Sequence, residues 1–322
     1  MKVTVLSGGV GGARFTRGLL QHLAQSGGEP GDVTVIANTG DDMWLHGVRV
    51  CPDLDTLMYT LGGAVHEDQG WGRRDESRRT SDDLAAYGLG WEWFTLGDLD
   101  LATHLARTEL LRAGHPLSEV TRVLCERWQP GVRLLPATDD EVETHVQTAQ
   151  GLMHFEEWWV RHRAGLPASR FVQVGLEGAT AAPGVLEAIA DADVVVLPPS
   201  NPVVSIGTIL AIPGIRDALR SRTGPVVGVS PIVAGSPVRG MADACLDAIG
   251  VETSTRAVAE HYGRRADGGI LDAWLVDAAD SAVVAPLRAA GWTVEATDTL
   301  MVDVDAAARI AGATLALADA SL

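Results

Sequence analysis

The chain has few cysteines, few basic residues and no long apolar run, and each shortage excludes a class of protein. Its three cysteines, Cys51, Cys125 and Cys245, are far apart and form no CxxC pair, which argues against a zinc site or a disulfide framework. No apolar stretch approaches the roughly 18 residues of a membrane span, and the first residues look like a strand rather than a signal peptide. We therefore expect a reduced, cytoplasmic protein with no membrane partner.

Basic side chains are outnumbered by acidic ones, 25 to 42, which gives a formal net charge of −17. A nucleic-acid partner normally requires a basic face, so this balance argues against one. A small phosphate ligand is still compatible, because backbone N–H groups and a divalent cation can supply positive potential locally. The charge therefore excludes polyanions more strongly than it excludes nucleotides.

Hydrophobic patterning indicates an α/β fold. Short β-branched runs at residues 2–6 and 33–38 flank a helical pattern over 13–26, which predicts a βαβ unit opening a parallel sheet. Residues 67–166 are richer in helical patterns and charge, and they hold six of the nine tryptophans. Strand-like runs then return at 171–175, 192–202, 225–231, 273–277 and 293–297.

This layout predicts one sheet domain, made of residues 1–66 and 167–322, that is interrupted by a mainly helical second domain at 67–166. Open α/β sheets bind ligands beyond the carboxyl ends of their strands. We therefore searched those ends for side chains that carry chemistry.

Four glycines, Gly8, Gly9, Gly11 and Gly12, lie between the first strand and the first helix. Backbone N–H groups in such a turn can hold a phosphate, although a tight turn needed only for packing would use the same residues. The turn lacks the Gly-Lys-Ser/Thr ending of a P-loop, and the second strand ends at Asn38 rather than at an acidic ribose ligand. A phosphate-containing ligand other than ATP or NAD is the prediction.

Four aspartates follow the second strand: Asp41, Asp42, Asp53 and Asp55. Carboxylates beside a phosphate loop are typical of Mg²⁺ that is held together with substrate phosphates. A carboxylate there could also take a proton from an attacking hydroxyl. Alternatively, all four are solvated loop residues, and Asp53 caps the helix that follows.

A third polar segment contains Ser200, Asn201 and Ser205, directly after the strand at 192–197. These side chains could cap the next helix, or they could hold the ribose, base or phosphate of a nucleotide opposite the glycine turn.

The segment at 67–166 adds His104 and Arg107, whose spacing places them on one face of a helix. A lone histidine is more often structural than a ligand, so both interpretations stay open. Tryptophans such as Trp71 are mostly expected in the core, but those lining a cleft would stack on a flat heteroaromatic ligand.

Taken together, these segments resemble one family over nearly the whole chain, in the same order and with compatible spacing. It is the 2-phospho-L-lactate transferase family of deazaflavin coenzyme F-420 biosynthesis. HGVRVCPDLDT, RWQPGVRLLPA and GMADACL bring the chain closest to the actinobacterial branch. The other matching segments are GGVGGAR, NTGDDMWLHGVRVCPDLDTLMYTLGG, GWGRRDES, GDLDLATHL, ETHV, MHFEEWW, PSNPVVSIGTIL, SPIVAG and TDTLM.

The resemblance implies a Rossmann-like domain with a helical second domain. It also implies a reaction in which a phosphate-linked three-carbon acid is transferred from a guanosine diphosphate ester to the ribityl hydroxyl of the deazaflavin Fo, with release of GMP. In the actinobacterial branch that acid is enolpyruvate, whereas archaeal members are associated with lactate.

The resemblance also suggests roles for the residues singled out above. The glycine turn and the segment with Ser200, Asn201 and Ser205 would hold the donor. Mg²⁺ would lie among the four aspartates, with Asp41 and Asp55 as the expected ligands and Asp53 or Asp42 as the base. Trp71, His104 and Arg107 would form the wall on which the deazaflavin lies. Leu99 stands where the resemblance leads us to expect an arginine, so donor affinity or the choice of acid depends on whether that arginine contacts a substrate.

Two other hypotheses use the same glycine turn. One is a nucleotide-sugar-binding regulator of the gluconeogenesis-factor type, which would have little need for an aromatic-rich insertion. The other is a dinucleotide-dependent oxidoreductase, against which Asn38 at the end of the second strand argues. A homodimer is possible.

Overall fold

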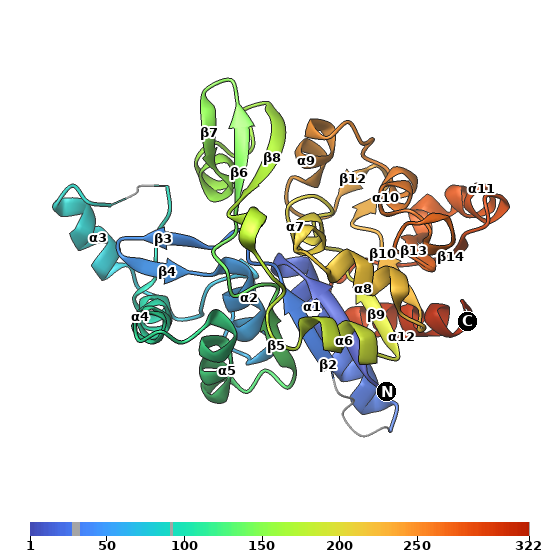
Figure 1. Cartoon of the computed structure of the whole chain (residues 1–322), viewed down its shortest axis with the longest axis horizontal. Coiled ribbons are helices and arrows are strands. Elements are labelled where there is room, and N and C mark those ends of the chain that lie inside the picture. Colours follow the sequence, from blue (N-terminus) through green and yellow to red (C-terminus); the bar gives the residue numbers. More distant parts are fainter. Residues whose placement is uncertain (28–32, 91–92, 322) are drawn as a thin grey trace.

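A seven-stranded parallel sheet forms the centre of the molecule in the computed structural model, which describes residues 1–27, 33–90 and 93–321 (Figure 1). The strand order is β14-β13-β10-β9-β1-β2-β5, and each neighbouring pair is parallel. The strands are β1 (Val3–Ser7), β2 (Val33–Ala37), β5 (Arg133–Pro136), β9 (Val194–Leu197), β10 (Val226–Val229), β13 (Ala273–Asp277) and β14 (Thr293–Thr297).

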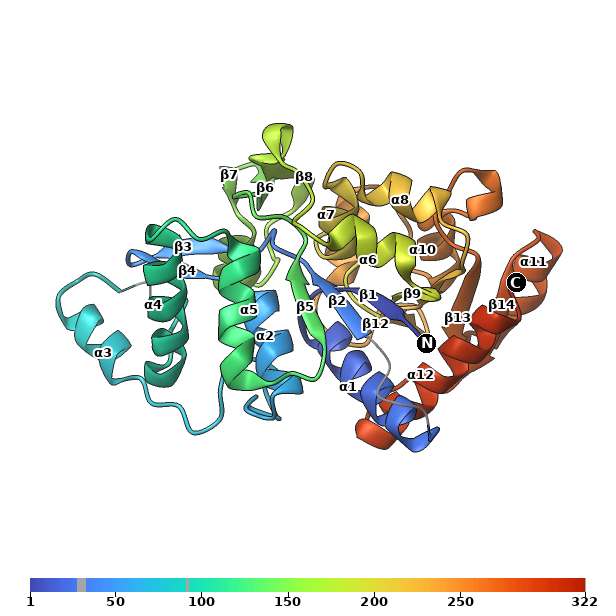
Figure 2. The same cartoon turned by 60° about the horizontal axis from the view of Figure 1, so that its bottom comes forward.

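Helices cover both faces of this sheet, which is why its central strands are largely apolar. Side chains alternate between the faces along β1: Val5 packs in one core with Phe15, and Leu6 packs in the other with Ile189. The first core lies under α1 (Gly9–Gln25), α2 (Pro52–Leu61) and α12 (Val304–Asp319). The second lies under α6 (Val185–Asp191), α7 (Ile206–Ala211) and α8 (Ile215–Ser221), and Figure 2 shows α6 and α12 on opposite sides.

The strand order reverses direction at β1. The chain adds β2 and β5 on one side of β1 and then crosses back to add β9, β10, β13 and β14 on the other. In open α/β sheets, the crevice at such a reversal, beyond the carboxyl ends of the strands, is where ligands bind. Here that reversal lies between β1, which ends at Ser7, and β9, which ends at Leu197.

A lobe outside the sheet is built between β2 and β5 (Figure 1). A hairpin of β3 (Met43–Leu45) and β4 (Val48–Val50) packs against Leu96 in a small core of its own. Beside it lie α3 (Arg79–Ala86), α4 (Asp98–Arg112) and α5 (Leu117–Trp128). A three-stranded antiparallel sheet follows, with β7 (Gly151–His154), β6 (Glu143–Thr148) and β8 (Ala168–Val174) in that order and a π-helix at Glu157–Arg161.

The remaining elements complete the second half of the chain: β11 (Ile232–Val233), β12 (Ser236–Pro237), α9 (Ala242–Ala248), α10 (Thr255–Tyr262) and α11 (Val284–Ala289). Among the described residues, no helix combines the length and apolarity that a membrane crossing requires.

The predicted α/β class with a parallel sheet is confirmed, and three local predictions need correction. Helix α1 begins at Gly9 rather than near residue 13, so the glycines form its first turn instead of a separate loop. The run at 171–175 belongs to β8 of the small antiparallel sheet, because it pairs with β6. Strand β5 lies inside the segment expected to be mainly helical, yet it pairs with β2. Its four residues are too short a run to reveal a strand by pattern. The division into two domains stays a prediction.

Candidate functional site

The glycine turn is held tightly against the end of β9. Ser200 Oγ accepts a hydrogen bond from the Gly8 N–H at 3.3 Å and donates one to the Gly8 carbonyl at 2.8 Å. A Cβ added to Gly11 would lie 2.4 Å from the Pro199 carbonyl oxygen, and one added to Gly12 would lie 1.9 Å from Ser7 Oγ. Glycine is therefore required here for close packing, whatever the turn binds.

The other two polar residues after β9 also serve local structure. The Asn201 carboxamide oxygen accepts hydrogen bonds from the Val203 and Val204 N–H groups, at 2.9 and 3.3 Å. Ser205 is the residue before α7, and a Cβ added to Gly8 would lie 2.5 Å from its Cβ. The structure thus brings the two predicted donor-binding segments together, with their side chains engaged in shaping the turn.

Three buried carboxylates, Asp41, Asp53 and Glu156, form what we call the carboxylate cluster. Each is less than a tenth exposed. Burial, Asp53 and Glu156 raise the pKa of Asp41 well above its usual value. Burial and the charge of Asp53 raise the pKa of Glu156 to about 8. Within the described chain, no arginine or lysine forms a hydrogen bond or ion pair with any of the three.

Asp53 is the best-supported member of the carboxylate cluster. It lies in the first turn of α2, accepts a hydrogen bond of 2.9 Å from Asn38 Nδ2, and also accepts one from the Gly9 N–H at the start of α1. Burial raises the pKa of Asp53 to about 6, and these two hydrogen bonds limit the rise. The end of β2, the start of α1 and the start of α2 therefore meet at one carboxylate.

Several buried oxygens around this point lack a hydrogen-bond partner in the described chain: Ser7 Oγ, Thr39 Oγ1, Asp41 Oδ1 and both carboxylate oxygens of Asp42. A buried polar atom without a partner is costly, so such a group of oxygens fits a site that is completed by a ligand. Hydroxyl and carboxylate oxygens are the donors that Mg²⁺ prefers. The residues present therefore fit the Mg²⁺ that the sequence leads us to expect.

Asp55 belongs to a second group, which we call the arginine cluster: Asp42, Asp55, Arg49, His104 and Arg107. Arg107 donates a short hydrogen bond to Asp55 Oδ1 and a second one, of 3.2 Å, to the Arg49 carbonyl. His104 Nδ1 lies 3.6 Å from Asp55 Oδ2. Asp42 lies 4.0 Å from the Arg49 guanidinium, and burial raises its pKa to about 7 although Arg49 lowers it. Arg49 and Arg107 thus lie next to these two carboxylates, and Asp55, His104 and nearby Asp100 each offer a possible metal-ligand atom within 4.8 Å of the others.

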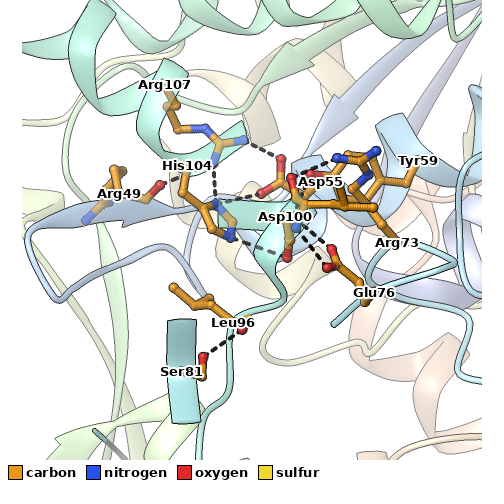
Figure 3. A network of polar contacts seen from close by, with 11 residues as sticks. Arg49, Asp55, Tyr59, Arg73, Glu76, Ser81, Leu96, Asp100, His104 and Arg107 are labelled. Carbon is orange, nitrogen blue, oxygen red and sulfur yellow. Dashed lines mark hydrogen bonds and ion pairs between the residues drawn. The ribbon is translucent and has the colours of Figure 1, made fainter. Parts of the chain in front are cut away.

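The arginine cluster continues through His104 to a second layer of polar groups (Figure 3). His104 Nε2 lies 3.3 Å from Asp100 Oδ2, and the Tyr59 hydroxyl donates a hydrogen bond of 2.6 Å to Asp100 Oδ1. Glu76 accepts hydrogen bonds from the N–H groups of Leu99 and Asp100 at the start of α4. These contacts fix α4 against α2 and so fix where Arg107 meets Asp55.

A cavity of about 900 Å³ opens between the β3–β4 hairpin and the small antiparallel sheet. Two tryptophans and two histidines are in its wall, and they come from β3, β6, β7 and the residues just before Leu96. His154 ties this wall to the acidic residues, because its Nε2 lies 3.3 Å from the Asp42 carbonyl and its Nδ1 accepts the Glu156 N–H at 3.1 Å. The lining residues are Met43, Trp44, Gly90, Trp93, Glu143, His145, His154, Glu157 and Arg161.

The four predicted aspartates are all buried near one edge of the sheet, but they separate into two groups. Asp41 and Asp53 interact with each other and with Glu156, whereas Asp55 interacts with Arg107 and His104. Asp41 and Asp55, which we expected to share a metal, are thus in different surroundings. The cause is that the two aspartates of each pair, Asp41 with Asp42 and Asp53 with Asp55, point in different directions. The sequence spacing alone does not show which aspartate of one pair faces which aspartate of the other.

The predicted acceptor wall is also arranged differently. His104 and Arg107 are each only 1% exposed and point to Asp55 rather than to the cavity. Trp71 is 52% exposed and is not among the residues lining the cavity. Residue 99 is a leucine where an arginine was expected, but the side chain of another arginine contacts this position. Arg73 donates a hydrogen bond of 2.7 Å to the Leu99 carbonyl.

Glu156, Trp44 and Trp93 are the residues that the sequence analysis missed. Glu156 lies in the segment MHFEEWW, whose two tryptophans suggested only packing. Trp158 is indeed fully buried, and it stands two positions after the cluster carboxylate. Two adjacent glutamates before two tryptophans were the available signal, because one of those tryptophans, Trp158, is buried.

The fold and the site together define an α/β protein of Rossmann type that carries buried acidic groups at the topological reversal of its sheet. Comparison with known families then identifies it more closely. A family model described as "2-phospho-L-lactate transferase CofD" matches residues 3–319, and the chain belongs to that family.

Curated relatives agree with this assignment. A protein named phosphoenolpyruvate transferase from Thermobifida fusca is 59% identical over 99% of this chain and 98% of its own length. A protein of the same name from Mycolicibacterium smegmatis is 55% identical over the full length of both. The resemblance found in the sequence is therefore confirmed, including its actinobacterial branch.

Among solved structures, a member of the UPF0052 family from Bacillus halodurans aligns with a TM-score of 0.64, 19% identity and 98% coverage of both chains. At that identity the likeness concerns the fold alone. It confirms the α/β architecture over nearly the whole chain.

Proposed function

We propose that the protein transfers a phosphoenolpyruvyl, or alternatively a 2-phospho-L-lactyl, group from a guanosine diphosphate ester to the ribityl hydroxyl of the deazaflavin Fo, releasing GMP, in coenzyme F-420 biosynthesis. Membership of the family and the names of the relatives support the transfer of such a group. The observation that carries the proposal is the pairing of a buried carboxylate cluster with an aromatic-walled cavity of about 900 Å³.

The donor would lie beyond the carboxyl ends of β1 and β9. Its diphosphate would face the start of α1 and the carboxylate cluster, since helix N-termini favour anions. Gly8, Gly9, Gly11 and Gly12 let the backbone approach the donor closely. Ser200, Asn201 and Ser205 would act by shaping that approach, because their side chains already bond within the turn or pack against it.

Asp41 and Asp53 would hold Mg²⁺, which when bound neutralises the charge of the diphosphate. This assignment rests on the contrast between the two groups of acids: the carboxylate cluster contains no basic partner in the described chain, whereas Asp55 is already neutralised by Arg107. Asp55 then has a different task, which is to hold Arg107 in place beside Asp42.

In the reaction the acceptor hydroxyl oxygen attacks the phosphorus that carries the three-carbon acid, and the bond between that phosphorus and the GMP oxygen breaks. GMP leaves with the electron pair, and the hydroxyl proton passes to a carboxylate. Asp42 is our candidate for this base. Both of its carboxylate oxygens lack a hydrogen-bond partner in the described chain, Arg49 lies 4.0 Å away, and Asp42 directly precedes Met43 of the cavity wall.

The acceptor would lie in the cavity, with its flat ring system against Trp44 and Trp93. His104 and Arg107 would support the site from behind through Asp55 rather than touch the deazaflavin.

A direct assay tests the proposal. Purified protein with Mg²⁺, Fo and either the enolpyruvyl or the lactyl guanosine diphosphate ester should release GMP and form an acidic deazaflavin, and mass spectrometry of the product identifies the acid transferred. Omitting Fo gives the control for donor hydrolysis. Folded protein that forms no product with either donor contradicts the proposed function.

A further inference from the structure

Arg49 is a buried arginine in the β3–β4 hairpin of the outer lobe. It is the middle residue of β4, and its neighbours Val48 and Val50 pack into the small core with Leu96. Because side chains alternate along a strand, Arg49 points to the opposite face of the hairpin, where its cross-strand partner is Trp44. The Arg49 guanidinium carbon lies 5.8 Å from the centroid of the Trp44 ring, and only 4% of Arg49 is exposed.

The backbone of Arg49 is bonded to α4 through both of its polar groups. Its N–H donates a hydrogen bond of 2.8 Å to Thr108 Oγ1, and its carbonyl accepts one of 3.2 Å from Arg107 (Figure 3). The main chain at Arg49 is therefore held in place, and the side-chain contacts decide which groups the guanidinium reaches.

Two carboxylates from different elements face the Arg49 guanidinium. Arg49 Nη1 donates a hydrogen bond of 2.8 Å to Glu143 Oε1 in β6, whereas Arg49 Nη2 lies 4.0 Å from Asp42 Oδ2, beyond hydrogen-bond distance. Both Asp42 oxygens are buried and have no hydrogen-bond partner in the described chain. Asp42 therefore lies beside a positive charge while its oxygens stay open to accept a proton, an arrangement that suits a general base.

One guanidinium thus connects the candidate base to the wall of the acceptor cavity. Glu143 and Trp44 line that cavity, and Asp42 directly precedes Met43, which lines it as well. A guanidinium is planar and presents its donors in a rigid fork, so it fixes its partners relative to one another more closely than a flexible lysine ammonium does.

We propose that Arg49 is a positioning residue of the transfer, which holds Asp42 in register with the acceptor cavity through Glu143 and Trp44. This inference rests on the proposed function and adds a residue to it. Arg49 acts through Asp42 rather than by contact with a substrate. Positioning matters here because a displacement of about 1 Å in a reacting group can cost about 100-fold in rate.

Loss of this register has a chemical consequence that can be measured. When the acceptor hydroxyl is no longer aligned with Asp42, water can attack the donor phosphorus in its place. A bond from phosphorus to the water oxygen then forms, the bond to the GMP oxygen breaks, and GMP leaves together with the free phosphorylated acid. GMP is released in both reactions, but only the transfer makes the deazaflavin product.

The ratio of deazaflavin product to released GMP tests the inference, because it does not depend on how much of the protein is folded. Arg49→Lys keeps the charge and loses the planar fork. It should lower the kcat of transfer by about 10- to 100-fold and lower the product ratio, while KM for the donor stays unchanged. Arg112→Met is the matched control and should change neither, because this exposed arginine holds the same hairpin through a hydrogen bond of 3.0 Å to the Gly47 carbonyl.

Variants of Glu143 test the same contact from the other side if Arg49→Lys does not fold. Glu143→Ala removes the oxygen that holds Arg49 Nη1, so the product ratio should fall. Glu143→Gln retains an oxygen that can accept this hydrogen bond, and it should keep more of the ratio. Equal ratios in wild type, Arg49→Lys and Glu143→Ala contradict the inference. A lower rate at an unchanged ratio contradicts it too, because loss of folded protein alone has that effect.

Failure of the inference and failure of the proposed function are distinguishable. If wild type forms the deazaflavin product and the Arg49 and Glu143 variants form it at the same rate and ratio, only the role of Arg49 is wrong. If folded wild type forms no product with either donor, the proposed function fails, and the role of Arg49 fails with it.

Discussion

The guanidinium of Arg107 is bonded to the carboxylate of Asp55 in the interior, with 1% and 7% of the two side chains exposed. Removing one member of such a pair leaves the other charge buried and uncompensated, which is far more costly than losing a surface pair. The contact therefore makes a specific prediction about stability.

Arg107→Met should lower the free energy of unfolding by about 3 kcal/mol or more, as expected for a broken buried pair. Urea unfolding of Arg107→Met, Asp55→Asn and the double variant measures the effect, and the double variant should lose less than the sum of the two. Arg122→Met is the control, since its pair with Glu126 is about two-thirds exposed and should cost under about 1 kcal/mol. If Arg107→Met and Arg122→Met lower the free energy of unfolding equally, the buried pair stabilises the fold no more than the exposed pair does.

Asp53→Asn should leave the fold intact and reduce the rate of GMP formation by about 100-fold or more, because it removes a negative charge where the cation and the diphosphate meet. Circular dichroism checks the fold, and turnover at saturating Mg²⁺ separates weak cation binding from a slower reaction. Asp267→Asn, at an exposed carboxylate paired with Arg264, is the matched control. A near-normal rate for Asp53→Asn would remove this residue from the site.

Gly11→Ala should destabilise the protein by about 1–3 kcal/mol, the usual range for overpacking. The new methyl carbon would stand 2.4 Å from the Pro199 carbonyl oxygen, and a backbone atom cannot rotate away. Gly178→Ala is a suitable control, because a Cβ there has no heavy atom within 4 Å. If Gly11→Ala unfolds at the same urea concentration as wild type, the turn is looser than described.

Glu143 gives the protein a specific dependence on pH. Burial opposes its ionisation, but the His145 ring nitrogen 3.5 Å away, the hydrogen bond of 2.8 Å from Arg49 and the Arg49 charge lower the pKa of Glu143 to about 2 in the folded state. Because the folded pKa is below the ordinary value of 4.5, this carboxylate stabilises the fold above about pH 4.5, and the contribution is lost as pH falls toward 2. Glu143→Gln should therefore lower Tm at pH 7 and have little effect near pH 2.5. An equal effect at both pH values would contradict the assignment.

Trp44→Ala should raise KM for Fo by about tenfold while KM for the guanosine donor stays unchanged, because an aromatic contact with the ring system is lost. Trp71→Ala provides the comparison that separates the two placements of the acceptor. If the acceptor lies where the sequence suggested, Trp71→Ala raises KM for Fo and Trp44→Ala does not.

The fold was largely predictable because its strands are short, β-branched and separated by helical patterns. Six of the seven main strands, all except β5, overlap runs visible in the sequence; β1 is shifted by one residue, and β9 occupies only four residues of the run at 192–202. Strand β5 was missed because its four residues follow a long excursion, and only pairing with β2 makes them a strand. Pairing between distant segments is information that a local pattern does not contain.

The site was predictable in its residue types but not in its grouping. The sequence brought four aspartates to one sheet edge, yet which of them face Arg107 depends on where α4 packs. His104 and Arg107 were correctly placed on one helix face, but whether that face is buried against α2 or lines a cavity is decided by tertiary contacts. Glu156 reaches the cluster from more than a hundred residues away, beyond any local signal.

The position of β1 in the sheet has a consequence for how the chain is made. β1 pairs with β2 nearby, but its other partner is β9, and the Lys2 N–H bonds to Asp193 across a separation of 191 residues. A chain emerging from the ribosome therefore exposes one edge of its first strand until well over half of it has been synthesised. Folding should be slower than in proteins of similar stability with mainly local contacts, because pairing of β1 with β9 closes such a long loop. The same late step brings Ser200 to Gly8, so the contact between the glycine turn and the end of β9 can form only after this pairing.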